Sequence, residues 1–442
     1  MKTMIKRILL SSSLILAAAT MPVSLYASGS EAGLQEATSV SEILLALILI
    51  LFAAKIGGEL FEKMKQPAVL GELIFGILIG NIALLSGDVF SFGNLFSNEI
   101  ISTLAELGVM ILLFQVGLES NIKDMMKVGI SSVLVAVIGV AVPMVLGYFV
   151  SSWILPGAGF NTWLFIGATL TATSVGITAR VLKDLGKLSI PEAKIILGAA
   201  VVDDVLGLII LSIVSGIIVS GSISVGSIAY TSFISLAFLA GSIIIGLWTA
   251  PKIGAWVSKM HVEGMKIVTA FLFMFIMSYL AIEAGLAAIV GAFAAGLVLD
   301  DVIFVNKKEH PIDVLVKPLY CIFVPIFFVL MGIQVDLSVF FDMQVIMIAL
   351  GITVASIIGK QACSVGVKCP EASKLIVGIG MISRGEVGLI FASVGKGLGV
   401  IDDSVFGAIV IMVILTTLVT PPLLKWSIQR KDLMFDNVKT DD

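Results

Sequence analysis

The stretch PEAKIILGAAVVDDVLGLIILSIVSG, residues 191–216, is apolar, long enough to cross a bilayer, and carries two adjacent aspartates at its centre, Asp203 and Asp204. A carboxylate near the middle of a bilayer costs about 2.5–3.5 kcal/mol on insertion scales, so two of them persist only where the protein uses or pairs them. Neighbouring side chains on a helix point about 100° apart, so one can face an ion pathway while the other contacts a neighbouring helix. The doublet predicts a cation and proton site; the alternative is an ion pair that only holds helices together.

The composition places the whole chain in a membrane. Of its 442 residues, 58% are hydrophobic and only 13% are charged, whereas soluble globular chains carry about 25% charged residues. The net charge is −4 and no basic patch exists beyond short loops, so no nucleic-acid partner is expected. Cys321, Cys363 and Cys369 lie in or at the ends of apolar runs, which favours core packing over disulfides.

Beyond Ser39, apolar runs of roughly 17–25 residues alternate with short polar joints. This pattern predicts an all-α polytopic membrane protein with about thirteen spans and no soluble domain. The expected spans are 41–62, 67–84, 98–118, 128–152, 160–183, 191–218, 225–249, 266–284, 286–303, 314–334, 341–366, 372–397 and 404–427.

The charges at the ends of the spans predict the orientation. Joints with lysines alternate with joints that lack lysine and arginine along nearly the whole chain, with Lys396 as an exception. Basic joints are cytoplasmic by the positive-inside rule, so residues 428–442 form a short cytoplasmic tail and the first span begins outside. Residues 1–28 have the pattern of a cleavable signal peptide, which agrees with that orientation; an uncleaved extra helix is the alternative.

Two of the spans contain polar interruptions. The fifth includes GATLTATSVGIT, residues 167–178, and the twelfth includes GIGMISRGEVGLI, residues 378–390. Each is the middle of a three-span unit, 128–218 and 341–427, and the two units start on opposite sides of the membrane. Interrupted spans in corresponding positions of inverted repeats indicate a transporter binding site.

Several polar residues in and near these interruptions are candidate site residues. Unwound backbone in the fifth span, with the hydroxyls of Thr173 and Ser174, would offer the oxygen ligands that alkali cations prefer; small-residue helix packing is the alternative. Lys360 is either a countercharge for Asp203 or a side chain that reaches the cytoplasmic face. Arg384 and Glu386 are expected to stabilise the crossing of the twelfth span, with Arg384 offsetting helix-end dipoles. We interpret the remaining intramembrane polar residues as packing or hydrogen-bond partners; they are Glu72, Glu106 and Gln115.

From residue 41 to 427 the chain resembles the second monovalent cation:proton antiporter family, the NapA- and Kef-like bacterial exchangers. The resemblance rests on these motifs: VLGELIFGILIGN at 69–81, LAELGVMILLFQVGLE at 104–119, TATSVGITARVL at 171–182, AAVVDDVLGLI at 199–209, GK at 359–360 and SRGEVGLIFA at 383–392. It implies an NhaA/NapA-like antiporter fold and a homodimer. Core units 128–218 and 341–427 would move like an elevator against dimerisation helices in 41–118 and 266–334.

The resemblance also assigns roles to the buried charges. In similar sodium-transporting members, the residue matching Asp204 binds the ion, and the residue matching Asp203 pairs with the lysine that matches Lys360. This charge set accompanies electrogenic exchange in the family. Two residues depart from the pattern: Asn81 stands where a proline is usual, and Gln115 stands where an apolar residue is usual. The glutamine beside a core helix points to a possible difference in ion selectivity, so Na⁺ is favoured over K⁺ by a modest margin.

The expected function is therefore secondary antiport of a monovalent cation, foremost Na⁺ held at Asp204, for H⁺ across a bacterial inner membrane. The expected partners are the cations, protons, the lipid bilayer and a second copy of the chain; no enzyme activity and no cofactor are expected. A K⁺/H⁺ antiporter or K⁺ efflux protein is the alternative, although only about fifteen residues follow the last span, which disfavours a nucleotide-gated efflux system. A channel or sensor on the same fold is a second alternative. An intramembrane aspartyl protease is a remote one, because adjacent aspartates on one helix cannot face each other.

Overall fold

The structure is a computed structural model that describes residues 31–86, 95, 96, 98–120, 122–220, 225–257, 260, 262, 264–299, 311–335, 337 and 342–440. The expected signal peptide, residues 1–28, lies outside the described residues. The chain divides into two compact units, 1–46 and 47–442. The described part of the first unit is helical, and everything below concerns the second unit.

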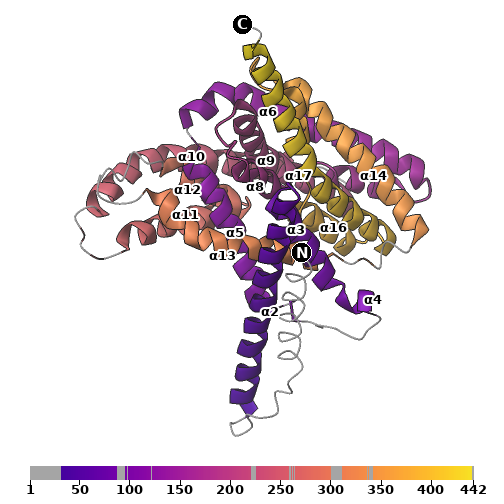
Figure 1. The fold of residues 1–442 in the computed structure, drawn as a ribbon. Coiled ribbons are helices and arrows are strands. Elements are labelled where there is room, and N and C mark those ends of the chain that lie inside the picture. Colours follow the sequence, from indigo (N-terminus) through magenta and orange to yellow (C-terminus); the bar gives the residue numbers. More distant parts are fainter. Residues whose placement is uncertain are drawn as a thin grey trace. The chain divides into compact units, whose positions relative to one another are not determined.

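Every regular element in the described residues is helical (Figure 1). The elements are α2 (Glu31–Lys63), α3 (Ala68–Gly80), α4 (Ile82–Ser86), α5 (Glu99–Leu118), α6 (Ile122–Ile154), α7 (Phe160–Thr169), α8 (Val175–Asp184), α9 (Pro191–Ser220), α10 (Val225–Val257), α11 (Met265–Glu283), α12 (Ala288–Val298), α13 (Ile312–Ile333), α14 (Met343–Ala362), the short 3₁₀-helix η2 (Cys363–Gly366), α15 (Lys374–Gly380), α16 (Glu386–Gly397) and α17 (Asp403–Thr440).

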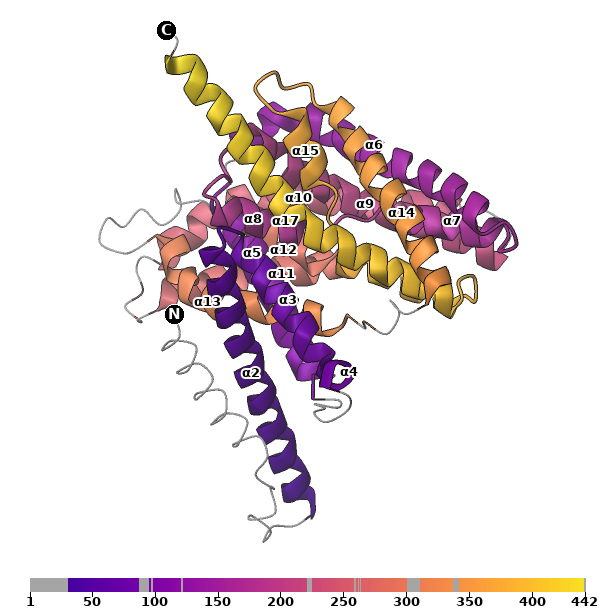
Figure 2. The ribbon, with the colours of Figure 1, turned by 45° about the vertical axis from the view of Figure 1, so that its right-hand side comes forward.

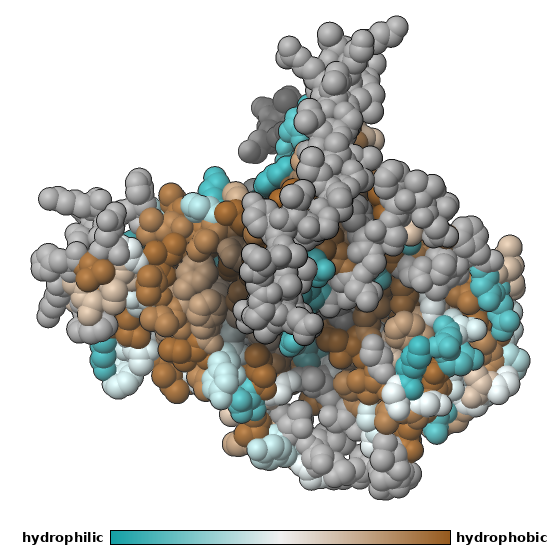
Figure 3. Space-filling model, turned by 90° about the horizontal axis from the view of Figure 1, so that it is seen from below, coloured by the Kyte–Doolittle hydropathy of each residue, from teal (hydrophilic) through white to brown (hydrophobic). Residues whose placement is uncertain are grey.

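The chain is a multi-pass membrane protein. Among the described residues, nine helices are long and apolar enough to cross a bilayer, and three more apolar helices are shorter: Ala68–Gly80, Ala288–Val298 and Val387–Gly397. A helix or a pair of helices occupies each of the thirteen expected ranges. Apolar side chains cover much of the coloured surface in Figure 3, as a lipid-facing surface requires.

The fold differs from the sequence-based prediction at two helix ends. The run expected over 67–84 ends at Gly80, and the separate helix α4 begins at Ile82. The last helix does not end near residue 427 but continues to Thr440, so most of the expected tail is helical. Its continuation is held to the rest of the chain because Lys431 Nζ lies 2.5 Å from Oε1 of the buried Glu192.

Helices α3, α5, α11, α12 and α13 pack against one another and form what we term the α5 group. Glycines bring their backbones close together. A Cβ atom at Gly108 would lie 2.2 Å from the Phe323 carbonyl oxygen, and one at Gly296 would lie 2.1 Å from that of Phe114. Small residues at helix crossings are the usual way in which membrane helices gain packing energy, because burial from lipid supplies little. The α5 group is thus a closely packed unit.

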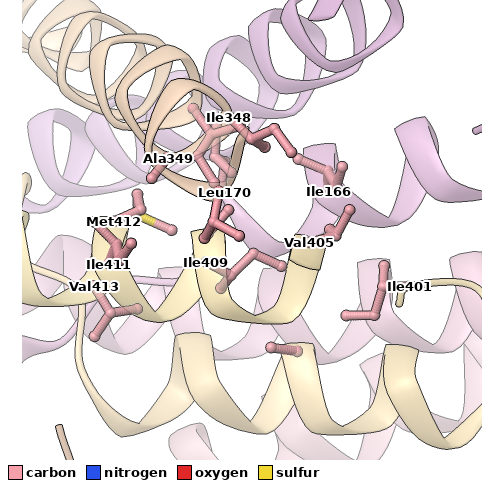
Figure 4. Close-up of a cluster of buried hydrophobic side chains, with 14 of the residues drawn as sticks. Ile166, Leu170, Ile348, Ala349, Ile401, Val405, Ile409, Ile411, Met412 and Val413 are labelled. Carbon is pink, nitrogen blue, oxygen red and sulfur yellow. The ribbon is translucent and has the colours of Figure 1, made fainter. Parts of the chain in front are cut away.

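Helices α6–α9 and α14–α17 form a second set, the α6 group, in which α6, α14 and α17 lie beside one another (Figure 2). It consists of two units of the same pattern, a long helix, a broken pair and another long helix, as the interrupted spans predict. Apolar side chains of α7, α14 and α17, among them Leu170, Ile348 and Met412, pack the units together (Figure 4). The two groups meet where α8 contacts α3 and α5 and where α17 contacts α3.

Candidate functional site

The two interrupted spans are broken in the middle, and their breaks bond to each other. Ser174 N–H donates to the Ser383 carbonyl at 3.0 Å, and Ser383 Oγ donates to the Ser174 carbonyl at 2.6 Å. Thr178 Oγ1, in the first turn of α8, donates to the Gly380 carbonyl at 2.7 Å. A Cβ atom at Gly385 would lie 2.6 Å from Ser174 Oγ, so this close approach requires glycine. The small and polar residues of both breaks therefore satisfy each other's backbone inside the membrane.

Arg384 is the central donor of this crossing. Its side chain is fully buried and donates to the Leu170 carbonyl at 2.5 Å, to the Ala172 carbonyl, and to Ser356 Oγ at 3.2 Å. Leu170 caps the C-terminus of α7, where the helix dipole is negative, and Ala172 lies in the break that follows, so a cation is stabilised there. Each hydrogen bond to a charged group contributes about 1.5–3 kcal/mol. Arg384 thus lies at the crossing of the two broken spans, the place predicted for it from the sequence.

Asp203 and Lys360 form a fully buried ion pair. Lys360 Nζ, on α14, lies 3.2 Å from Asp203 Oδ1, on α9, and the two side chains are 0% and 2% exposed. Helix α6 packs beside the lysine, because a Cβ atom at Gly139 would lie 3.6 Å from Lys360 Nζ, an ordinary contact distance. Lys360 therefore does not reach an aqueous surface. This rules out the alternative in which its side chain extends to the cytoplasmic face. Whether the pair acts as a countercharge stays a prediction.

Asp204 lies half-buried on another side of α9 and lines a cavity of about 10 Å³. That volume is about what one water molecule needs. The walls come from both helix groups, and include Leu113 on α5, Val175 on α8 and Ile289 on α12. Ile289 also borders a larger cavity of about 390 Å³ among α5, α12, α13 and α16, which includes Glu106 and Gln334. Asp204 therefore borders a small cavity, and one wall residue of that cavity also lines the larger one.

The remaining predicted ligands lie at the break between α7 and α8. Thr173 Oγ1 accepts a hydrogen bond from Arg384 Nη1 at 3.4 Å, and the Ser174 carbonyl accepts one from Ser383. These hydrogen bonds tie the Thr173 hydroxyl and the Ser174 carbonyl into the crossing of the two breaks. Glu386 is the first residue of α16, and its side chain lies outside the described part. The ion-binding roles of Thr173, Ser174 and Asp204 stay predictions.

Sequence reasoning missed a second buried ionic cluster, at the other end of α8. Arg180 Nη2 lies 3.4 Å from Glu72 Oε1 on α3, and Arg180 Nε lies 2.9 Å from Asp184 Oδ2. The sequence predicts Glu72 as a packing or hydrogen-bond partner and predicts no role for Arg180. The available signal was an arginine followed four residues later by an aspartate, on a short helix of an apolar chain.

Broken, crossing helices with buried charges beside them define the class of secondary transporters within multi-pass membrane proteins. The sequence comparison makes the class specific: residues 43–428 match the family of the sodium/hydrogen exchanger transmembrane domain. The chain belongs to the sodium/hydrogen exchanger family.

Its relatives include proteins named as antiporters, whose length is similar to that of this chain. The high-affinity Na⁺/H⁺ antiporter NhaS3 of Synechocystis sp. is 38% identical over 416 residues, which is 87% of this chain and 89% of the relative. The Na⁺/H⁺-K⁺ antiporter GerN of Bacillus cereus is 34% identical over 396 residues, 88% of this chain and 97% of the relative. Among solved structures, the sodium proton antiporter MjNhaP1 of Methanocaldococcus jannaschii shares the fold, with a TM-score of 0.60 at 19% identity; 88% of this chain and 97% of that chain are covered.

Proposed function

We propose that this chain is a secondary antiporter that exchanges Na⁺ for H⁺ across a bacterial inner membrane by alternating access. The observation that carries the proposal is the separation of the aspartate doublet. Asp203 is engaged by Lys360, whereas Asp204 borders a cavity beside the break in the fifth span. Membership of the sodium/hydrogen exchanger family supports the same substrates.

In the proposed cycle, Na⁺ and H⁺ take turns at the Asp204 carboxylate. An ionised carboxylate attracts the cation, while a proton neutralises the group and removes that attraction. Hydroxyl and carbonyl oxygens of Thr173 and Ser174 would complete the ligand set, since Na⁺ is a hard cation. Lys360 would hold the charge of Asp203 in the unloaded state, so the two aspartates have different tasks. No cofactor takes part.

Alternating access would come from movement of the α6 group against the α5 group. The α6 group contains the two units expected as the core, 128–218 and 341–427, and the α5 group contains most of the expected dimerisation helices in 41–118 and 266–334. The close glycine contacts inside the α5 group support its role as the static partner. An elevator-type motion of this kind, in an NhaA/NapA-like fold of thirteen spans, is our proposal.

Finer assignments extend from the same proposal. We assign the chain to the NapA- and Kef-like branch of antiporters, with a cytoplasmic C-terminus, an outside N-terminus after cleavage of residues 1–28, and a homodimeric assembly. The alternation of lysine-containing and lysine-free joints supports the orientation.

The main alternative is a different cation. The relative GerN is named a Na⁺/H⁺-K⁺ antiporter, so its name includes K⁺ as a transported cation. A K⁺/H⁺ antiporter or a K⁺ efflux protein is therefore the second candidate. A protease is disfavoured because Asp203 faces Lys360 while Asp204 borders a separate cavity. We propose a transporter and not an enzyme.

The test is cation-specific proton movement in proteoliposomes that enclose a pH-sensitive dye. Addition of Na⁺ should collapse an imposed pH gradient, with a smaller response to K⁺, and Asp204→Ala should fall to the level of protein-free liposomes. Asp403→Asn, at an exposed ion pair of the α6 group, is the matched control and should behave as wild type. A response to K⁺ that exceeds that to Na⁺ would favour the second candidate. Full activity in Asp204→Ala would place the site elsewhere.

A further inference from the structure

The seam between the α5 group and the α6 group differs at its two ends. At one end, the cavity of about 390 Å³ separates α16 from α5, α12 and α13, and Ser102, Met331 and Gln334 line it. At the opposite end of α5 and α13, helix α8 contacts α3, α5 and α13 through charged and aromatic side chains. The seam is therefore hollow at one end and joined by ionic contacts at the other.

Arg180 is the centre of the joined end. It is 8% exposed and lies 3.4 Å from Glu72 Oε1, while Glu72 is 3% exposed. Its guanidinium carbon lies 5.1 Å from the ring centroid of Tyr320 on α13, a cation–π distance. One guanidinium group thus contacts two helices of the α5 group.

A second contact lies about one turn further along α8. Lys183 forms an ion pair with Glu119, the residue that follows α5, and its Nζ lies 5.2 Å from the Tyr320 ring centroid. The side chains of this pair are 14% and 33% exposed, so water screens it more than the Arg180 contact. Both contacts cross the seam in the same place.

Helix α8 connects these contacts to the candidate ion site. Ser174 precedes its first residue, and Arg180 lies six residues further on, about 9 Å at 1.5 Å per residue. A helix of this length moves as one piece, so a shift of the break at Ser174 is transmitted to Arg180. The binding loop and the seam contact are two ends of one rigid element.

The pairing of Arg180 with Asp184 makes the contact with Glu72 reversible. Asp184 is on α8 itself, at 2.9 Å, so it stays with Arg180 if α8 moves away from α3. Within the described part of the chain, Glu72 Oε2 and Arg180 Nη1 have no hydrogen-bond partner, so the pair is not the bidentate arrangement that binds most strongly. Such a contact suits repeated formation and separation.

We propose that Arg180 is a positioning residue that, with Glu72, latches α8 onto the α5 group and keeps this end of the seam closed while the cavity is open at the other end. The inference rests on the proposed alternating access. In the opposite conformation the Arg180–Glu72 contact is separated, Asp184 keeps Arg180 paired, and the cavity closes. Ligands that favour that conformation must overcome the latch.

The test is Glu72→Gln in the full-length protein, which removes the charge, keeps the side-chain volume and leaves Arg180 paired with Asp184. Loss of the latch shifts the population toward the opposite conformation. The KM for Na⁺ added from the cavity side should rise about fivefold, and the KM from the other side should fall, measured in oriented vesicles. A purely structural role would lower the maximal rate in both directions without moving the two KM values apart.

A second measurement does not require transport. In a cysteine-free background, Met331→Cys reports the cavity through its labelling rate with a membrane-impermeant maleimide. We expect Glu72→Gln to slow this labelling, whereas Asp403→Asn, at the exposed pair with Lys396, leaves it unchanged. Unchanged labelling together with unchanged KM values would overturn the latch. Slowed labelling without any Na⁺-driven proton movement would retain the latch and reject the proposed function.

Discussion

Two buried ion pairs in the described part of the chain, Lys360–Asp203 and Arg180–Glu72, are chemically alike and lie in different places. Lys360–Asp203 joins α14 to α9 inside the α6 group, and its side chains are 0% and 2% exposed. Arg180–Glu72 joins the α6 group to the α5 group, with side chains 9% and 5% exposed, and Arg180 has a second acid on its own helix. Under the proposed movement, a pair inside one group would stay together, whereas a pair between the groups would have to separate. We therefore propose that Lys360–Asp203 serves the ion site and Arg180–Glu72 serves the movement.

The largest effect in this comparison is expected at Arg384, which holds the two breaks together inside the α6 group. In Arg384→Ala the Leu170 and Ala172 carbonyls lose their donor inside the membrane. The free energy of unfolding should fall by about 3–5 kcal/mol, the range for removing one partner of a buried charged contact. The thermal midpoint in detergent measures this. Arg384→Lys should recover only part of the loss, because lysine cannot reproduce the planar fork.

The next effect is expected at Lys360. Lys360→Ala leaves Asp203 buried without its lysine, which destabilises the protein by up to about 3–5 kcal/mol unless Asp203 is protonated. Protonation would change the charge moved in each cycle, and currents from proteoliposomes on a solid-supported membrane measure that charge. Currents identical to those of wild type, at equal transport rates, would remove Lys360 from the mechanism.

At the seam, the partly exposed Lys183–Glu119 pair should have a smaller effect than either. Glu119→Gln should change stability by about 1 kcal/mol or less, because the pair is partly screened by water. As for Glu72→Gln, the KM for Na⁺ should nevertheless rise on the cavity side and fall on the other side, by a smaller factor. If both KM values instead moved in the same direction, the Lys183–Glu119 pair would not be part of the latch.

The smallest effect is expected at the exposed pair of the α6 group. Lys396 and Asp403 lie 2.6 Å apart with side chains 52% and 86% exposed, and such pairs contribute about 0–1 kcal/mol. Asp403→Asn should therefore leave the thermal midpoint, the transport rate and both KM values unchanged. A clear loss of transport would mean that removal of any charge in the α6 group impairs the protein. The effects at the buried ion pairs could then not be assigned to their positions.

Much of this architecture could be predicted from the sequence because the patterns that indicate helices and breaks lie within short segments. Apolar runs of the right length mark helices, and runs of threonine, serine and glycine, or Ser383-Arg384-Gly385, mark the breaks. Contacts between distant segments are not local. Glu72 and Arg180 are 108 residues apart, and nothing in the pattern of either helix says that α3 and α8 adjoin. The contact between Lys431, on the C-terminal part of α17, and Glu192 was missed for the same reason, because the two residues are 239 positions apart.

The central claim is that one carboxylate, Asp204, binds Na⁺ and H⁺ alternately. Its most direct test is proton release when Na⁺ is added to the purified protein in weakly buffered detergent solution, with Na⁺ binding measured by calorimetry on the same sample. At a pH where the carboxyl group is partly protonated, wild type should bind Na⁺ and release protons, and Asp204→Asn should do neither. Sodium binding without proton release, or equal release from Asp204→Asn, would contradict the account.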